Sequence, residues 1–302
     1  MSKVKIVTDS TAYLPSDMIA KYDIQVIPLH VLFGETSYAE GVDITNAEFY
    51  DKLKHSKSFP TTSQPPLAEF LKTYTELTNS DHQVLSIHIS GKLSSTIESA
   101  VAARKQLPDT QIEVVDSFLT TMALGMVVLS AGKAAADGES LPEIKKHVEQ
   151  LANSVNLLFV VNTLEYLRKG GRIGGATALL GTMLNIKPIL YLKHGRIEPL
   201  ARVRSKPKAI ARLLKLMKQR VPQGGSVHVA IMHAQAFDEA VALEKQVRAQ
   251  FNCRDVYFSE IGPVIGTHVG PGALGVAFYS DQGFAPLPVA ETWRPGAMAA
   301  PA

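Results

Sequence analysis

The chain has 302 residues, of which 46% are hydrophobic and 20% are charged. This composition is typical of a globular protein, and the length predicts about two domains. The net charge of +3 is too small to indicate nucleic acid as a partner.

One cysteine, Cys253, is present, which excludes an internal disulfide and a cysteine-rich zinc site. The longest apolar stretch, 122–136, is shorter than the roughly 20 residues that cross a bilayer. The N-terminus enters a strand pattern at once and has no signal-peptide core. We therefore expect a cytoplasmic protein.

Strands and helices alternate through the first half of the chain, which predicts a parallel, doubly wound sheet. Thr45 and Glu48 form a capping-box pattern at the start of one helix. Three prolines in 58–66 exclude that segment from a sheet interior and predict a turn. The expected strands are 3–10, 24–33, 83–89 and 111–117, and the expected helices are 16–23, 45–56, 67–78, 95–107, 120–136 and 140–155.

The second half predicts a smaller α/β unit. A hairpin is expected over 187–204 with its tip at His194-Gly195, and a basic amphipathic helix follows from Pro207. Further strands are expected at 157–161, 226–234, 254–262 and 274–279, with helices at 176–184 and 237–251. The predicted fold class is α/β: an N-terminal, mainly parallel domain (1–155) packed on a second domain (156–280), with 58–75 against the latter and a flexible tail at 281–302.

Several familiar motifs do not fit. Residues 270–275 match G-x-G-x-x-G, but a strand follows them instead of a helix, so they are not a dinucleotide fingerprint. The nine histidines show no metal-ligand spacing, and we expect no metal or other cofactor. Asp9-Ser10 and Asp116-Ser117 end two parallel strands, where capping of the next turn is the favoured interpretation.

Three clusters of small hydroxyl residues, at 59–65, 89–100 and 266–272, are more informative together than singly. Each alone is typical of a turn. The cluster around Ser94 follows a strand and opens a helix, whose free N–H groups favour an anion. Arg172, between two glycine pairs, can form a bidentate pair with a carboxylate or phosphate.

At these positions the sequence resembles the DegV family of fatty-acid-binding proteins, the lipid-carrying subunits of bacterial fatty acid kinases. The resemblance covers roughly residues 3–279, and the order of its segments makes it specific. The segments are "VTDSTAYLP", "PTTSQP", "SGKLSSTIESA", "VVDS", "EYLRKGGRIG", "IKPIL" and "GTHVGPGALGVAFY".

The resemblance implies a long-chain fatty acid buried between two domains in a protein that is not itself an enzyme. The residues it implies for the carboxylate are Thr62, Ser63, Ser94, Arg172, Thr267 and His268. Residues 124–129, 178–184 and Ile265 are candidates for the tunnel wall. This chain has Ser95-Thr96-Ile97 where the family usually has Gly-Thr-Tyr, a change close to the expected head group.

The resemblance also implies a partner kinase that phosphorylates the bound acid. Arg202 and Arg204 are the candidate docking residues, and loading at a membrane surface implies a transient contact there. Two alternatives stay open at this point. One is a lipid hydrolase or acyltransferase that uses Ser94 and His268, and the other is a lipid-dependent regulatory protein without a kinase.

Overall fold

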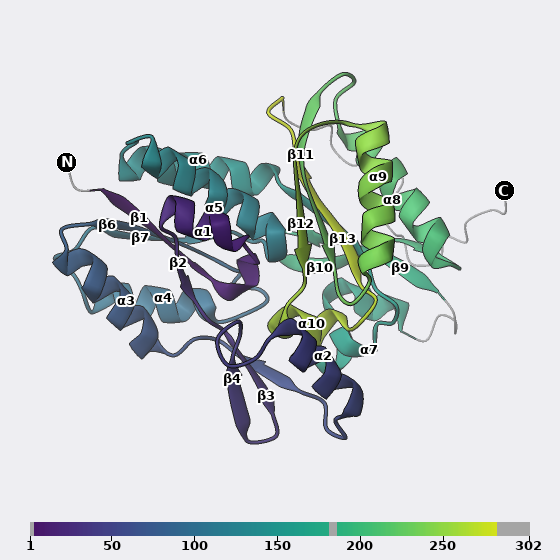
Figure 1. Ribbon diagram of the computed structural model, residues 1–302, viewed down its shortest axis with the longest axis horizontal. Helices are drawn as coiled ribbons and strands as arrows, with labels where there is room; N and C mark the ends of the chain where they lie inside the picture. The colour runs from purple at the N-terminus through teal and green to yellow at the C-terminus, as the bar shows by residue number, and fades with distance from the viewer. Residues whose placement is uncertain (1–2, 181–185, 283–302) are drawn as a thin grey trace.

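The computed structural model describes residues 3–180 and 186–282, so most of the expected tail, from residue 283 on, lies outside the described residues (Figure 1). The first sheet is parallel throughout, in the order β2-β1-β6-β7. Its strands are β1 (Val4–Asp9), β2 (Gln25–Ile27), β6 (Gln83–His88) and β7 (Ile112–Asp116). The α/β class with a parallel N-terminal sheet is confirmed.

Helices cover both faces of this parallel sheet, which explains why its strands read as apolar runs. One face carries α1 (Ser16–Tyr22), α5 (Thr121–Ala136) and α6 (Leu141–Ser154), and the other carries α3 (Leu67–Asn79) and α4 (Thr96–Lys105) (Figure 1). The short 3-10 helix η1 (Ser10–Ala12) follows β1. Most of α5 is buried because it packs on β1 and also on two strands of the second large sheet.

A small antiparallel sheet departs from the expected pattern. It has the order β4-β3-β5, with β3 (His30–Phe33), β4 (Thr36–Ala39) and β5 (Thr61–Ser63). The single strand expected over 24–33 is wrong: it is divided at Pro28 between two sheets. The turn expected at 58–66 also contains the strand β5. The prolines flank this strand, which lies at the edge of its sheet, so the missing proline N–H groups break no hydrogen bond between strands.

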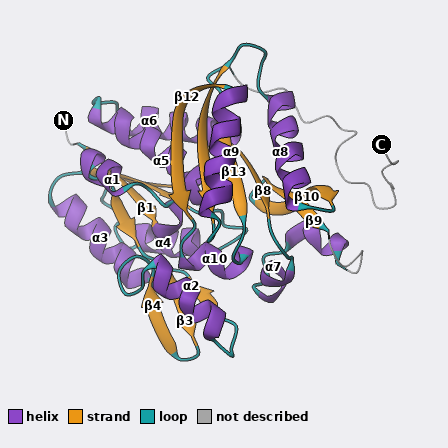
Figure 2. Cartoon of the chain, turned by 45° about the vertical axis from the view of Figure 1, so that its right-hand side comes forward, coloured by secondary structure: helices purple, strands orange, loops and turns teal. Residues whose placement is uncertain are grey.

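The second large sheet has the order β10-β9-β8-β13-β11-β12. Its strands are β8 (Asn156–Val160), β9 (Lys187–Lys193), β10 (Arg196–Val203), β11 (Ser226–His233), β12 (Asn252–Glu260) and β13 (Leu274–Tyr279). β11 and β12 run parallel, and the other neighbours run antiparallel. Helices α8 (Lys206–Arg220) and α9 (Phe237–Gln250) cover one face (Figure 2), while α5 packs on the other.

A seven-residue helix, α10 (Pro263–Val269), stands where the sequence indicated a turn. Pro263 suits its first turn, and Gly270 ends it with a φ of 70°. The helix contacts β3, β5 and α2 (Asn46–His55) on one side and α7 (Glu165–Lys169) on the other. It therefore brings the "GTHVGPG" segment against two other segments singled out in the sequence.

Candidate functional site

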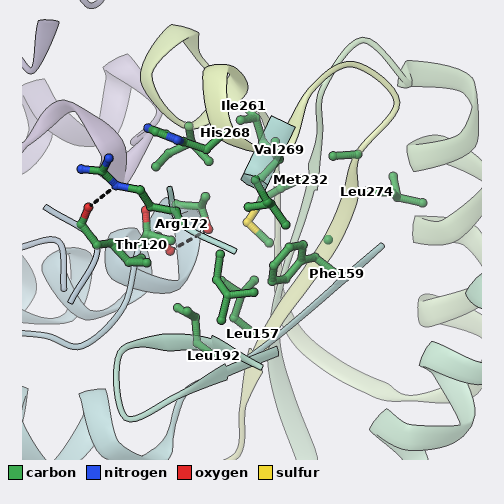
Figure 3. A pocket seen from close by; sticks show the side chains of 17 residues that line it. Thr120, Leu157, Phe159, Arg172, Leu192, Met232, Ile261, His268, Val269 and Leu274 are labelled. Carbon is green, nitrogen blue, oxygen red and sulfur yellow. Dashed lines mark hydrogen bonds between the residues drawn. The ribbon is translucent and has the colours of Figure 1, made fainter. Parts of the chain in front are cut away.

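An apolar cavity lies between the inner face of the six-stranded sheet and the start of α5 (Figure 3). The space between its lining atoms, counted out into the open solvent at the mouth, is about 580 Å³. Strand alternation supplies much of the wall: Leu157 and Phe159 line the cavity, whereas Leu158 and Val160 pack on the opposite side with α8 and α9.

Thirteen of the 17 residues that line the cavity are apolar or glycine. The polar exceptions are Thr120, Thr121, Arg172 and His268. Figure 3 shows Thr120, Arg172 and His268 on one side, opposite Phe159, Met232 and Leu274. The cavity therefore suits a molecule with an apolar part and one polar end.

His268 is held at the polar end by α10. Its side chain is buried, with Nε2 2.9 Å from the Thr62 hydroxyl, and no partner is described for Nδ1. Burial, and to a lesser extent the charge of Arg172, lowers the pKa of His268 to about 4, so the ring is neutral at pH 7.

The hydrogen bonds of His268 indicate which nitrogen carries the proton. With the proton on Nε2 the ring donates to Thr62 and leaves Nδ1 as an unpaired acceptor. The other tautomer would leave a buried unpaired N–H, which is rarer in proteins. We therefore assign the proton to Nε2, which frees the Thr62 hydroxyl hydrogen to donate to a ligand.

Arg172 is fixed at the polar end by backbone oxygens. Its Nε donates to the carbonyl of Leu93 at 3.0 Å and its Nη1 to that of Gly170 at 2.9 Å. These bonds use two of the five N–H groups of a guanidinium, so the fork is oriented before a ligand arrives and keeps donors for it.

The other residues expected to bind the carboxylate differ in whether their side chains lie near Arg172 and His268. Ser94 Oγ lies 2.9 Å from Thr96 Oγ1, in the same turn that holds Arg172 through Leu93. The buried Thr267 hydroxyl donates to the carbonyl of Pro263 in its own helix. Ser63 follows Thr62 in β5, so strand alternation directs its side chain away from His268.

A buried carboxylate anchors α10 from the N-terminal part of the chain. Glu40 Oε1 accepts from the Val264 N–H at 2.8 Å and from the Tyr13 hydroxyl at 3.1 Å, and the Tyr13 hydroxyl accepts from Ile265 N–H at 3.2 Å. Two free N–H groups in the first turn of the helix are thus satisfied. Desolvation raises the pKa of Glu40 to about 7. No pattern in the sequence indicated this role for Glu40.

Two glycines are required for close packing around the polar end. A Cβ at Gly170 would lie 2.1 Å from His268 Nδ1, and a Cβ at Gly270 would lie 2.4 Å from the Tyr166 ring. The glycine-rich segments therefore let α10 and the turn after α7 approach each other.

The hydrogen bonds do not assemble the Ser94–His268 pair that a hydrolase would need, because each residue bonds to a different neighbour. A Ser-His-Asp arrangement is present elsewhere. Ser86 Oγ lies 2.6 Å from His88 Nε2, and His88 Nδ1 lies 3.0 Å from Asp9 Oδ2. All three side chains are inaccessible, and the Tyr74 hydroxyl donates to Ser86, so no substrate reaches this group.

The remaining expectations fall on other parts of the structure. Asp9 and Asp116 each accept a backbone N–H of the turn that follows, as the capping interpretation predicted. Of the expected wall, Ile265 lines the cavity, whereas 124–129 is buried within α5 away from it, and 181–184 lies outside the described residues. Arg202, in the edge strand β10, and Arg204, just beyond it, are exposed.

Within residues 3–180 and 186–282, every helix is too short or too polar to cross a bilayer. Over the same residues, no three His, Cys, Asp or Glu side chains are grouped so as to hold a metal ion.

The chain is similar to solved structures over most of its length. A DegV family protein from Thermus thermophilus, described as fatty-acid binding, is 37% identical and superposes with a TM-score of 0.86 over 92% of this chain and 99% of its own. DegV from Bacillus subtilis, described as a fatty acid binding protein, gives 35% identity and a TM-score of 0.85 over 93% and 100%. A stearic acid-binding protein from Eubacterium ventriosum gives 26% and 0.84 over 93% and 98%.

Sequence comparison agrees. A DegV domain-containing protein of Halalkalibacterium halodurans is 38% identical across 93% of this chain and all of its own. The family model described as uncharacterised protein, DegV family, matches residues 3–281. These matches, which extend over nearly the whole chain, show that it belongs to the DegV family.

Proposed function

We propose that this protein binds a long-chain fatty acid in the apolar cavity, with its carboxylate at the polar end. The observation that carries the proposal is the division of the cavity into an apolar wall and a single polar side with Arg172 and His268. Thr62, Ser94 and Arg172 would donate to the carboxylate, His268 would orient the Thr62 hydroxyl for this contact, and Ser63 and Thr267 would lie in the supporting backbone around them. Solved relatives described as fatty-acid binding support the proposal.

The two parts of the cavity would contribute differently to binding. Burial of an acyl chain contributes about 0.8 kcal/mol per methylene, so a chain of roughly 16 carbons gains on the order of 12 kcal/mol before ordering costs. A hydrogen bond to a charged group contributes about 1.5–3 kcal/mol. The wall would thus supply most of the affinity, and the polar end would select an acid over an ester.

Lipid extraction tests this proposal directly. Mass spectrometry of the denatured, purified protein should detect a stoichiometric acid of 14–18 carbons, and the delipidated protein should take up palmitate. Protein that releases no acid and takes none up would contradict the proposal. Turnover of acyl esters that depends on Ser94 would instead support the hydrolase alternative.

The finer part of the proposal is that the bound acid is presented to a separate fatty acid kinase in the cytoplasm, with loading at a membrane surface. The kinase would transfer a phosphoryl group to the carboxylate, and Arg202 and Arg204 would lie in the docking surface. Loaded protein, ATP and a bacterial fatty acid kinase should yield acyl phosphate, trapped as a hydroxamate. Reversing both charges should lower the yield without changing palmitate affinity; no hydroxamate with active kinase would contradict this part.

A further inference from the structure

A second polar feature lines the cavity, at the start of α5. Thr120 is 6% exposed, and its hydroxyl is buried without a described hydrogen-bond partner. A buried hydroxyl without a partner is costly, so a ligand atom that hydrogen-bonds to it would be stabilised there. Thr120 lines the cavity on the side of Arg172 and His268 (Figure 3).

Thr120 is also the N-cap residue of α5, yet its side chain makes no capping hydrogen bond. The first intrahelical bond runs from Leu124 N–H to the carbonyl of Thr120, so earlier N–H groups have no acceptor within the helix. The first turn of this 16-residue helix contains no acidic residue. The positive end of the helix dipole, which lies beside the cavity, is therefore not compensated by an acidic residue of the helix's own first turn.

The backbone at this point is held in an unfavourable conformation. Thr121 has a φ of 56°, which is strained for a β-branched residue. Its hydroxyl donates to the carbonyl of Thr120 at 2.6 Å. This conformation holds Thr120 at the cavity wall while its hydroxyl leaves the helix uncapped.

We propose that the Thr120 hydroxyl and the first turn of α5 form a second part of the carboxylate site, on the same side of the cavity as Arg172 and His268. The inference rests on the proposed function, because it assigns an additional contact to the same acid. A helix N-terminus favours an anion, and a carboxylate has acceptor sites for several donors at once. The bound acid would cap α5 and satisfy Thr120, and Arg172 would neutralise its charge.

The test compares Thr120→Val with Thr120→Ser in delipidated protein, using palmitate labelled with ¹³C at the carboxyl. Valine keeps the shape and removes the hydroxyl, so palmitate should bind about tenfold more weakly or worse. Serine should stay within about threefold of wild type. The pKa of the bound carboxyl, followed by ¹³C NMR, should rise in the valine variant because the ionised form loses a hydrogen bond.

The stability of the lipid-free protein distinguishes a binding role for Thr120 from a structural one, because loss of a structural hydroxyl would lower the melting temperature. Removal of an unpaired buried hydroxyl should leave the melting temperature of Thr120→Val unchanged or raised, whereas palmitate binding falls. Thr120→Ala serves as a second variant should valine prevent folding. If the Thr120→Val and Thr120→Ala variants bind palmitate with wild-type affinity and the bound carboxyl keeps its wild-type pKa, the inference is overturned and the proposed function stands. Weaker palmitate binding with an unchanged carboxyl pKa would also overturn the inference. Failure of wild type to bind any acid would overturn the proposed function with it.

Discussion

Two buried histidines of this protein differ in how completely their hydrogen bonds are satisfied. His88 has a partner on each nitrogen, Ser86 at 2.6 Å and Asp9 at 3.0 Å, and is wholly inaccessible in the parallel sheet. His268 has one partner, Thr62, and an unpaired Nδ1. The first arrangement is closed, whereas the second lies beside a cavity and leaves the Thr62 hydroxyl hydrogen free for a ligand.

The difference separates structural polar groups from binding groups. A complete buried network holds elements together, and each of its members would be costly to unpair. An incomplete group costs stability until something completes it. Two of the buried unpaired side-chain atoms, His268 Nδ1 and Thr120 Oγ1, belong to residues that line the same cavity. Pairing, rather than residue type, thus distinguishes the candidate site from the Ser-His-Asp group.

The largest expected effect is on the closed network. Asp9 accepts from Thr11 N–H, the Thr11 hydroxyl, Ile89 N–H and His88. Asp9→Ala leaves these buried donors unpaired, so we expect the free energy of unfolding to fall by roughly 3–5 kcal/mol. Urea denaturation of lipid-free protein measures this loss. His268→Gln should lose far less stability and much more palmitate affinity; equal losses of stability would refute the distinction.

A smaller effect, dependent on pH, is expected at Glu40, which faces Asp9, Tyr13 and Tyr50 and anchors the helix that carries His268. Its pKa is raised from 4.5 to about 7, so the folded state holds a proton that the unfolded state releases. Stability from this group is full below pH 4.5 and is lost as the pH rises through 7. The full loss is roughly 3 kcal/mol.

Glu40→Gln should remove this dependence, because the amide keeps an acceptor for Val264 and carries no charge. Denaturation at pH 5 and pH 8 should show wild type losing stability relative to the variant as pH rises. His268→Gln should show the opposite sign, because the lowered pKa of His268 costs stability as pH falls from 6.5 toward 4. Parallel pH profiles for wild type and Glu40→Gln would show that Glu40 is ionised at both values.

Local patterns predicted most of the fold. The alternating elements, the Thr45–Glu48 capping box and the His194-Gly195 hairpin tip are all present. The predictions failed where contacts between residues far apart in the sequence determine the secondary structure. β5 is a strand only because β3 lies beside it, and α10 is a helix whose first turn depends on Glu40, more than 220 residues earlier.

The candidate site was only partly predictable for the same reason. Arg172 and His268 stand out as charged or titratable residues among glycines, and both line the cavity. Thr120 has no such signal, because a threonine before a helix normally caps it. Its importance depends on an unmade hydrogen bond, which only the folded structure reveals.

The smallest and sharpest test changes the surroundings of His268 without touching its side chain. Gly170 has an ordinary φ of −77°, so alanine fits the backbone, but the added Cβ would lie 2.1 Å from His268 Nδ1. The imidazole must move away from Thr62, and we expect palmitate affinity to fall about tenfold, the equivalent of one hydrogen bond. Fluorescence titration or calorimetry of delipidated protein measures this change.

Gly171 offers a matched control, since a Cβ there has no atom within 4 Å but the residue has a φ of 71°. Gly171→Ala should therefore lose about 1–2 kcal/mol of stability through backbone strain and keep its palmitate affinity. The two neighbouring substitutions thus separate displacement of the imidazole from general disturbance of the turn. Equal palmitate affinities in the two variants would mean that the position of the His268 ring does not affect the ligand, and the contrast with His88 would lose its functional meaning.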